Sequence, residues 1–330
     1  MVKSILITGG TGSFGKQFIK TLLEQGHPYE RIIVFSRDEY KQFEMSQRPE
    51  FEGQKKLRYF VGDVRDKERL NRALDGVDVV IHAAALKQVP SCEYNPIEAV
   101  KTNIMGAQNL IETSIDRNVK KVIALSSDKA CSPINLYGAT KLCSDKLFIA
   151  GNVYSGSHDT RFAVLRYGNV MGSRGSVIPY FQKLLAQGSK RLPITHFDMT
   201  RFWLHLDQAV EMVFTTLDEM QGGELFVRKN PSLKITDLAR AIEPEAQLYE
   251  IGLRPGEKIH EMMISKEDAR NTIEFDDYYV IQPFFWEKKH LLEGALVDEG
   301  FEYHSGNNSS WLTINEMRNI IYPERELSLV

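Results

Sequence analysis

Hydrophobic positions in the first half of the chain alternate between two periodicities. Short runs rich in β-branched residues, typical of buried strands, lie at Ser4–Thr8, Arg31–Phe35, Arg58–Val61, Val77–Ala83, Lys121–Ser126 and Phe162–Tyr167. Between them, apolar residues recur at helical spacing in Phe14–Glu24, Lys67–Leu74, Ile97–Asn118 and Gly138–Ala150. Repeated strand–helix–strand units produce parallel strands with helices on both faces. The pattern therefore predicts an α/β fold with a doubly wound parallel sheet.

This alternation stops after Tyr167. Glycine and serine cluster at Gly172–Ser176, helical spacing returns in Pro179–Ala186 and Leu206–Met220, and short mixed elements follow from Gly222. We predict one domain around the sheet and a second, smaller α/β domain. Their expected bounds are 1–168 plus about 201–221 for the first, and about 169–200 plus 222–330 for the second.

Composition and charge narrow the functional class. The 330 residues are 42% hydrophobic and 26% charged, and the net charge of −3 does not favour nucleic acid or an anionic membrane. The apolar run Ile5–Ile7 is too short for a signal sequence, and no later run approaches the roughly 20 apolar residues of a membrane helix. Cys92, Cys131 and Cys143 have neither disulfide-framework nor metal-site spacing, and the eight histidines show no metal spacing. We expect a cytoplasmic protein without a metal, a nucleic-acid partner or a membrane anchor.

A glycine-rich turn joins the first predicted strand to the first predicted helix. It reads Gly9-Gly10-Thr11-Gly12-Ser13-Phe14-Gly15, with glycines spaced as G-x-x-G-x-x-G. Glycines permit a tight turn and let backbone amides approach a pyrophosphate at the positive end of the helix. Any strand-to-helix turn can use glycine, but this one lies within a βαβ unit. We therefore predict that this turn binds a dinucleotide.

The end of the second predicted strand indicates which dinucleotide binds. NAD enzymes usually place an acidic residue there, which binds the ribose 2′-hydroxyl. Here Ser36, Arg37 and Lys41 can instead hold a 2′-phosphate. Asp38, which we also expect at this site, and Glu39 are compatible with a solvated, mixed-charge helix start. We predict NADP as the cofactor.

Asp63 and Val64 follow the third predicted strand and have two interpretations. In the first, the segment holds the adenine, and the carboxylate accepts a hydrogen bond from the adenine amino group. In the second, Asp63 is an ordinary turn residue. The sequence leaves both open.

Tyr137 and Lys141 begin the helix after the fifth predicted strand and share one helix face. An ammonium nearby and a positive nicotinamide ring would both favour a phenolate, which makes Tyr137 a base for a substrate hydroxyl. Lys141 can also bind the nicotinamide ribose. The Y-x-x-x-K spacing is common on solvated helices, but here it follows both the glycine turn and Ser126-Ser127. This context favours a catalytic role.

Together these motifs resemble the extended short-chain dehydrogenase/reductase superfamily. The matching segments are Thr8–Gly12, Asp63, His82–Ala85, Thr102-Asn103, Tyr137 with Lys141, and Arg166–Val170. The resemblance implies a Rossmann fold, an NADP-binding first domain and a second domain that binds a nucleotide sugar. It also implies that Ala83 lines the cofactor ribose, Asn103 lies beside the nicotinamide, and Ser127 acts with Tyr137 and Lys141. Lys87 and Val170 are further expected cofactor contacts.

Asp128 and Lys129 narrow the resemblance. Retaining sugar 4,6-dehydratases of the superfamily carry an Asp-Glu pair here and epimerases carry no such pair, whereas Asp-Lys resembles the inverting UDP-N-acetylglucosamine 4,6-dehydratases. Similar segments are Ala85–Pro90, Asn135–Lys141 and Leu253–Lys258. The family's usual threonine is Ser127 here, which keeps the hydroxyl. That family implies dimers assembling into hexamers, and a product used for pseudaminic acid or a related surface glycan.

The chemistry gives these residues separate tasks. Tyr137 takes the O4 proton while the C4 hydride passes to NADP+, and the resulting ketone acidifies the C5 proton. Lys129 removes that proton if its amine is neutral, which requires burial or the cofactor cation to lower its pKa from about 10.4. An ionised Asp128 would act in the opposite direction, so we assign Asp128 as the proton donor to the departing C6 hydroxyl. Hydride then returns to C6, and protonation of C5 from the other face inverts that centre.

The same resemblance assigns the sugar-nucleotide site. Its residues here are Lys87, Tyr137, Asn169, Arg174, Val177, Thr195, Met199, Arg201, Arg254 and Glu257. The arginines suit the diphosphate, which needs cations. Without the resemblance, each of these would be interpreted as a solvated side chain or a local salt bridge.

Three alternatives compete with this interpretation. A C4 or C5 epimerase acting on a UDP-sugar would share the fold and the cofactor, but C4 epimerisation needs no C5 base. A non-enzymatic NADP-sensing module would keep the fold and lose the active tyrosine, whereas Ser127, Tyr137 and Lys141 are all present. Finally, Asp128 and Lys129 would form only a surface ion pair if they did not lie at the carboxyl end of the sheet.

Overall fold

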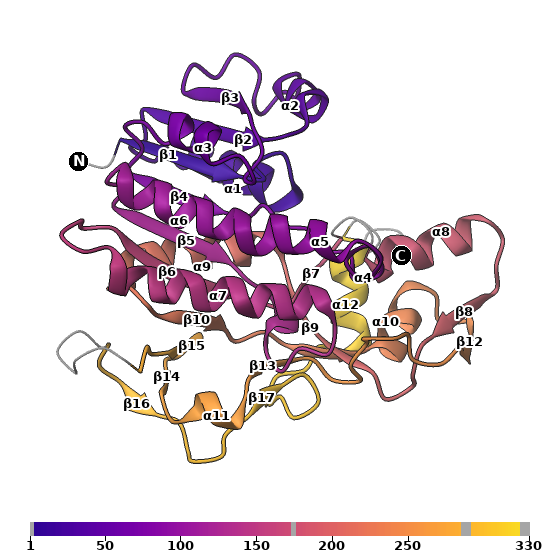
Figure 1. The fold of residues 1–330 in the computed structure, drawn as a ribbon. Helices are drawn as coiled ribbons and strands as arrows, with labels where there is room; N and C mark the ends of the chain where they lie inside the picture. The colour runs from indigo at the N-terminus through magenta and orange to yellow at the C-terminus, as the bar shows by residue number, and fades with distance from the viewer. Residues whose placement is uncertain (1–2, 173–175, 285–291, 324–330) are drawn as a thin grey trace.

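A computed structural model of the chain describes residues 3–172, 176–284 and 292–323 (Figure 1). Within these residues a ten-stranded sheet has the order β16-β14-β15-β10-β6-β5-β4-β1-β2-β3. Pairing is parallel from β10 to β3 and antiparallel from β10 to β16. The strands are β1 (Ser4–Thr8), β2 (Arg31–Ser36), β3 (Leu57–Val61), β4 (Val79–His82), β5 (Lys121–Leu125), β6 (Arg161–Arg166), β10 (Leu225–Arg228), β14 (Thr272–Glu274), β15 (Tyr278–Ile281) and β16 (Ala295–Leu296).

Helices cover both faces of this sheet. They are α1 (Ser13–Glu24), α2 (Glu39–Ser46), α3 (Lys67–Ala73), α4 (Val89–Tyr94), α5 (Pro96–Ala99), α6 (Gly106–Asp116), α7 (Leu136–Tyr154) and α9 (Leu206–Glu219). Figure 1 shows α6 and α7 in front of the strands. Successive strand residues face opposite sides, so Ile5 and Ile7 pack with α1 and α9, whereas Leu6 packs with α3, α6 and α7. The predicted α/β architecture, with a parallel sheet covered on both sides, is confirmed.

A smaller region, made of β7–β9, β11–β13, β17, α8, α10 and α12, packs at the carboxyl ends of the parallel strands. Its strands are β7 (Asn169–Val170), β8 (Arg191–Ile194), β9 (Thr200–Leu204), β11 (Ser232–Lys234), β12 (Gln247–Glu250), β13 (Met262–Ile264) and β17 (Tyr303–His304). Its helices are α8 (Val177–Ala186), α10 (Ile235–Ile242) and α12 (Ile314–Ile321). The short α11 (Lys266–Ala269) lies between β13 and β14 in the chain. A separate hydrophobic core around the fully buried Trp203 holds the region together.

The strand pairing differs from the predicted division into domains in two places. Strands β10, β14, β15 and β16 lie beyond Gly222 but extend the large sheet. Phe226 and Val227 of β10 are buried on opposite faces, because β10 continues the parallel sheet next to β6. In the other direction, β9 pairs with β7 and β11 in the smaller region, although residues 201–204 were assigned to the first domain. The strands concerned are short and their connections are mixed, so the sequence pattern did not indicate which sheet each strand joins.

The predicted helix Ile97–Asn118 is divided by a π-helix, η1 (Val100–Met105), between α5 and α6. Its wider turn buries both Thr102 and Asn103 against the rest of the chain. π-Helical turns are rare in proteins, and those that occur often lie at functional sites. Here the π-helix ends beside the loop that follows β4.

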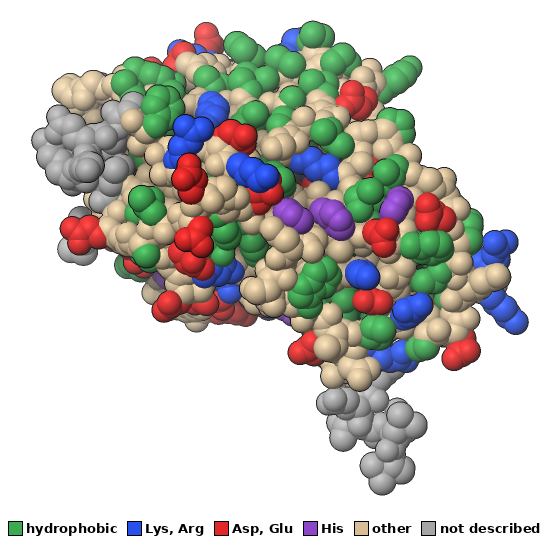
Figure 2. All heavy atoms as spheres, turned by 90° about the horizontal axis from the view of Figure 1, so that it is seen from below, with side chains coloured by type: hydrophobic (Ala, Val, Ile, Leu, Met, Phe, Trp, Pro, Cys, Tyr) green, Lys and Arg blue, Asp and Glu red, His purple; other side chains and the backbone are tan. Residues whose placement is uncertain are grey.

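On the face shown in Figure 2, acidic and basic side chains are interspersed rather than gathered in one field. Several of the chain's exposed charges form ion pairs, such as that between Lys67 and Glu112. None of the helices in the described ranges is long and apolar enough to cross a membrane.

His82, at the end of β4, links folding to pH. Its Nδ1 lies 2.8 Å from the Thr8 hydroxyl oxygen, and burial, with a smaller contribution from the Lys141 ammonium, lowers its pKa to about 3. The unfolded chain binds this proton near pH 6.5, so the free energy of unfolding should fall by about 1.4 kcal/mol per pH unit between pH 6.5 and 3 on account of this one group.

We therefore expect His82→Gln to be less stable than wild type at pH 7, with a deficit that shrinks as the pH falls to 4. Urea unfolding at intervals of half a pH unit measures the difference. A deficit that stays constant would mean that His82 takes up its proton in the folded state at its ordinary pKa.

Candidate active site

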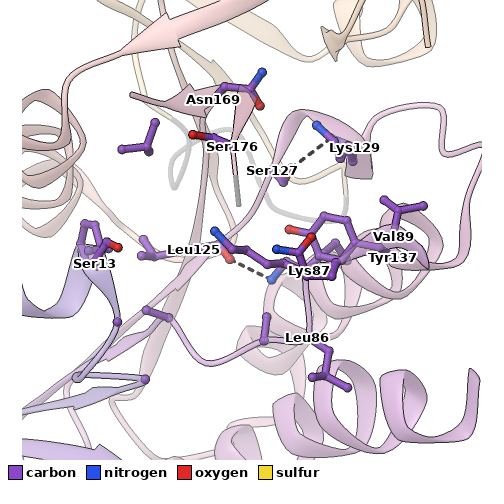
Figure 3. A pocket seen from close by; sticks show the side chains of 18 of the residues that line it. Ser13, Leu86, Lys87, Val89, Leu125, Ser127, Lys129, Tyr137, Asn169 and Ser176 are labelled. Atoms are coloured by element: carbon purple, nitrogen blue, oxygen red, sulfur yellow. Dashed lines mark hydrogen bonds between the residues drawn. The ribbon is translucent and has the colours of Figure 1, made fainter. Parts of the chain in front are cut away.

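A cavity of about 1240 Å³ lies between the large sheet and the smaller region, at the carboxyl ends of the parallel strands. Ligands of doubly wound folds bind at this end of the sheet. Its volume exceeds the roughly 300–1,000 Å³ that suits one drug-sized ligand. Figure 3 shows Ser127 and Lys129 on one side of the cavity with Tyr137 and Lys87, and Ser13 on the other side. The space can hold two ligands end to end.

The glycine turn after β1 has the geometry of a pyrophosphate site. Gly9 has a φ of +67°, and a Cβ atom there would lie 2.9 Å from the Ala84 nitrogen. No side chain caps the start of α1, so its first amides remain available to a ligand in the cavity. A Cβ on Gly15 would lie 2.5 Å from Gly10, which shows how closely α1 packs on the turn. These residues fit a dinucleotide.

Two cations border the cavity at the end of β2, and each already has a carboxylate partner. Arg37 lies 3.9 Å from Asp63, and the Lys41 ammonium lies 2.8 Å from Asp38. Asp38 also caps α2 by accepting a hydrogen bond from the Lys41 amide. Asp63 accepts hydrogen bonds from Arg65, which outweigh burial and lower the pKa of its carboxyl group. A ligand phosphate would therefore compete with internal ion pairs for these cations.

Tyr137 borders the cavity as a protonated phenol. Burial raises its pKa to about 12, against the opposing effects of Lys129 and of a hydrogen bond with Ser127. Lys141 instead donates a hydrogen bond to the Leu125 carbonyl oxygen at 2.8 Å (Figure 3). Burial, opposed by a smaller effect of Asp145, lowers the pKa of Lys141. Of the two positive charges expected to favour a phenolate, the protein itself supplies the Lys129 ammonium, and desolvation of Tyr137 outweighs its effect.

Lys129 lies between two carboxylates. The short 3-10 helix η2 (Asp128–Ala130) follows β5, capped by Ser127, and its Lys129 Nζ is 3.1 Å from Asp128 Oδ1 and 3.1 Å from Glu261 Oε1. Burial alone would lower the pKa of Lys129, but the two carboxylates outweigh burial and raise it. On balance the pKa of Lys129 is therefore raised, which favours its ammonium form.

Glu261 is a further charged residue of the site, and it was not predicted from the sequence. It lies just before β13, is 2% exposed, and borders the cavity. Its side chain also lies 3.7 Å from Arg201 Nε, while its Oε2 is buried without a hydrogen-bond partner. Glu261 lies 132 positions after Lys129 in the chain and next to Met262 and Met263, so no local spacing marked it.

Arginines from two segments line the other end of the cavity. Arg254 donates to Glu257 at 2.8 Å, and Arg201 lies 3.6 Å from the same carboxylate. Burial would raise the pKa of Glu257, but the two arginines outweigh it and lower the pKa. Lys87 borders the cavity, and burial with the charge of Lys129 lowers its pKa. These cations can bind a diphosphate.

Most residues assigned from the sequence border this one cavity. They are Gly9, Thr11, Gly12, Ser13, Phe14, Gly15, Ser36, Arg37, Asp38, Lys41, Asp63, Val64, Ala83, Lys87, Ser127, Lys129, Tyr137, Lys141, Asn169, Val170, Val177, Thr195, Met199, Arg201, Arg254 and Glu257. Arg174 lies outside the described residues.

The comparisons with known proteins agree with this geometry. A protein family described as polysaccharide biosynthesis protein matches residues 5–283. The chain is 55% identical, over 97% of both chains, to a Campylobacter jejuni protein named UDP-N-acetylglucosamine 4,6-dehydratase (inverting). The chain belongs to this polysaccharide biosynthesis protein family.

Other relatives show how wide the family is. A protein of Rickettsia conorii named UDP-glucose 4-epimerase is 39% identical over 98% of both chains. The crystal structure of Pen from Bacillus thuringiensis superposes with a TM-score of 0.89 at 36% identity, covering 98% of this chain and 99% of that one. The chain is thus similar over nearly its whole length to proteins with different names.

Two of the residues assigned from the family resemblance lie outside the cavity wall. Asn103 does not border the cavity; its amide exchanges hydrogen bonds with the Leu86 backbone and donates to Thr140, so it holds the loop after β4 against α7. Asp128 is also absent from the cavity wall, because its carboxylate is turned to Ser127 and Lys129. Both side chains position others.

Gly15 tests how tightly the cofactor turn is built. Gly15→Ala would stabilise an unconstrained helix by up to about 1 kcal/mol. Because its Cβ would meet Gly10, we expect destabilisation by about 1–3 kcal/mol instead, with at least a tenfold weaker affinity for the nicotinamide dinucleotide.

Gly26→Ala is the matched control. Its methyl group enters open space at a φ of +64°, so it should cost stability without changing cofactor affinity. Thermal unfolding and fluorescence titration with NADPH measure both effects. A stabilised Gly15→Ala protein would contradict the close packing of α1 on the turn.

Proposed function

We propose that this protein is a UDP-N-acetylglucosamine 4,6-dehydratase that inverts C5. The product would be UDP-2-acetamido-2,6-dideoxy-β-L-arabino-hexos-4-ulose, a precursor for pseudaminic acid or a related surface glycan. One observation carries the proposal: an amine, Lys129, borders the cavity beside Tyr137, where C5 proton removal requires a base. The inverting dehydratase of Campylobacter jejuni, at 55% identity, supports the same reaction.

Each side chain has a defined part in this reaction. A bound nicotinamide supplies hydride acceptance from C4 and hydride return to C6. Tyr137 removes the O4 proton, and Lys129 removes the C5 proton once C4 is a ketone. The Ser127 hydroxyl forms hydrogen bonds with both Tyr137 and Asp128, so it links the phenol to the loop that carries Lys129. Lys141 is fixed by the Leu125 carbonyl at the cofactor side.

Lys129 has to lose a proton before it can act as a base. In the ligand-free protein it is charged, with a carboxylate on each side. A proton that moves from Lys129 to one of these carboxylates leaves a neutral amine and a carboxylic acid. The amine is the base for C5, and the acid can protonate the departing C6 hydroxyl. The ion pair therefore contains both groups that elimination needs.

The substrate's diphosphate would bind to the cations at the far end of the cavity. Arg201 and Arg254 share Glu257 there, and Lys87 lies between the sugar end and the cofactor turn. Asn169, Val177, Thr195 and Met199 border the space that remains for the sugar and the uridine. We therefore propose that the cations bind the diphosphate of a small-molecule substrate, and that the other lining residues contact its sugar and uridine.

Arg37 and Lys41 support NADP rather than NAD. A 2′-phosphate would displace the weak 3.9 Å contact of Arg37 with Asp63. We expect Arg37→Ala to raise the Kd for NADP at least tenfold and that for NAD less than threefold, since a charge-assisted hydrogen bond contributes about 1.5–3 kcal/mol. Isothermal titration of the ligand-free protein measures both constants. Equal losses for the two dinucleotides would argue against a 2′-phosphate site.

Lys129→Met tests the base. In deuterated water with UDP-N-acetylglucosamine and NADP, wild type should release one water and incorporate deuterium at C5. The variant should lose elimination at least about 100-fold while NADP affinity stays unchanged, because general-base catalysis contributes about 10²–10⁴. Lys146→Met, on the exposed side of α7, is the control and should retain activity. Turnover by Lys129→Met would exclude Lys129 as the C5 base.

The second candidate is C4 epimerisation of a UDP-sugar, favoured by the relative in Rickettsia conorii named UDP-glucose 4-epimerase. The products of the two reactions differ in mass. An epimerase leaves the mass of the substrate unchanged, whereas a dehydratase lowers it by one water, about 18 Da. Mass spectrometry of the product with UDP-N-acetylglucosamine and UDP-glucose therefore separates them.

A further inference from the structure

The two carboxylates beside Lys129 are not equivalent. Asp128 Oδ1 accepts hydrogen bonds from both the Ser127 hydroxyl and Lys129, and the residue does not border the cavity. Glu261 meets Lys129 with one oxygen and borders the cavity. The second oxygen of each carboxylate is buried with no hydrogen-bond partner, so the difference between the two residues is that Glu261 alone of them borders the cavity. A buried carboxylate oxygen without a partner is costly and calls for a ligand or a function.

We propose that Glu261 is the acid of the elimination step: it takes the Lys129 proton and gives it to the departing C6 hydroxyl. This inference rests on the proposed dehydratase function and refines it. It assigns to Glu261 the part that sequence analysis gave to Asp128. Asp128 then becomes a positioning residue that holds Lys129 and Ser127.

The step balances in protons and charge. A proton moves from the Lys129 ammonium to Glu261 across the 3.1 Å contact, which leaves a neutral amine and a carboxylic acid. The amine removes the C5 proton of the 4-keto sugar, and the C5–H electrons form the C5–C6 double bond. The C6–O bond breaks, and the leaving hydroxyl takes the Glu261 proton as water. Lys129 is again an ammonium and Glu261 a carboxylate.

The smaller region holds Glu261 in place. Its backbone nitrogen donates to the Ser305 hydroxyl at 2.9 Å, and the Ser305 nitrogen donates back to the Glu261 carbonyl at 2.8 Å. Ser305 in turn lies 2.7 Å from the Thr200 hydroxyl. The backbone of Glu261 is therefore fixed from β9 and β17 while its carboxyl group faces Lys129.

Several charges act on this proton. Around Lys129 they are Asp128, Tyr137, Glu261, Arg201, Lys87 and Lys258. Burial would raise the pKa of Glu261, but Lys129, Arg201 and Lys258 together lower it. Glu261 is thus ionised at rest, and its proton has to come from Lys129.

The decisive variant is Glu261→Gln, which keeps the size and removes the acid. It should be incubated with NADP and UDP-N-acetylglucosamine in deuterated water. Without the acid, C4 oxidation and C5 proton removal continue but water is not lost. We expect elimination to fall at least about 100-fold, while recovered UDP-N-acetylglucosamine gains deuterium at C5.

Two outcomes of that experiment would overturn the proposal. Elimination within threefold of wild type would show that Glu261 is not the acid. Loss of C5 exchange together with elimination would show that Glu261 serves the base instead. If wild type itself removes no water from UDP-N-acetylglucosamine, the dehydratase function is what fails.

Two further variants separate Glu261 from its neighbours. Asp128→Asn should lower C5 exchange and elimination together, because it disturbs Lys129, so their ratio should stay at the wild-type value. Glu257→Gln makes the same chemical change four residues away and should raise the KM without altering that ratio. A change of the ratio in Asp128→Asn but not in Glu261→Gln would return the acid role to Asp128.

A measurement on the ligand-free protein tests the Lys129–Glu261 contact without turnover. Removing one carboxylate lowers the lysine pKa by about 1–3 units, so more neutral amine is present at pH 8.5. We expect acetylation of Lys129 by an N-hydroxysuccinimide ester, followed by peptide mapping, to be at least tenfold faster in Glu261→Gln. An unchanged rate would overturn the proton exchange between the two residues, whatever the substrate proves to be.

Discussion

The buried ion pairs of Lys129 are the interactions on which the active site depends. A charge that leaves water needs partners close by, and Lys129 has Asp128 on its own turn and Glu261 from the far end of the chain, each 3.1 Å away. Arg201 reaches the same cluster from β9. Lys129 on η2 therefore has both carboxylate partners only when the segment before β13 packs against η2.

The same burial keeps the ligand-free site at rest. Tyr137 is a phenol because desolvation outweighs the nearby cation, and Lys129 is an ammonium because two carboxylates outweigh desolvation. Neither group is in the state that removes a proton. Proton removal by either group therefore requires a change in its surroundings that favours the phenolate or the neutral amine.

The family's shared architecture places the chemistry in a few side chains. The turn after β1, the end of β2 and the Tyr137 helix form the cofactor side of the cavity, and relatives with dehydratase and epimerase names align over nearly the whole chain. The loop after β5 and the segment before β13 supply the charges beside Tyr137.

Local patterns were enough to predict the parallel sheet, its covering helices and the cofactor turn, because hydrophobic period, glycine spacing and helix-face spacing act over a few residues. Tyr137, Lys129 and the Gly9–Gly15 turn follow from such patterns and all border the cavity. Strand β10, the turned-away side chains of Asn103 and Asp128, and above all Glu261 did not follow. Their roles depend on which distant segments meet and on how desolvation and charge sum at one point. These long-range contacts and electrostatic effects arise only in the folded chain, which is why the sequence did not reveal Glu261 as a partner of Lys129.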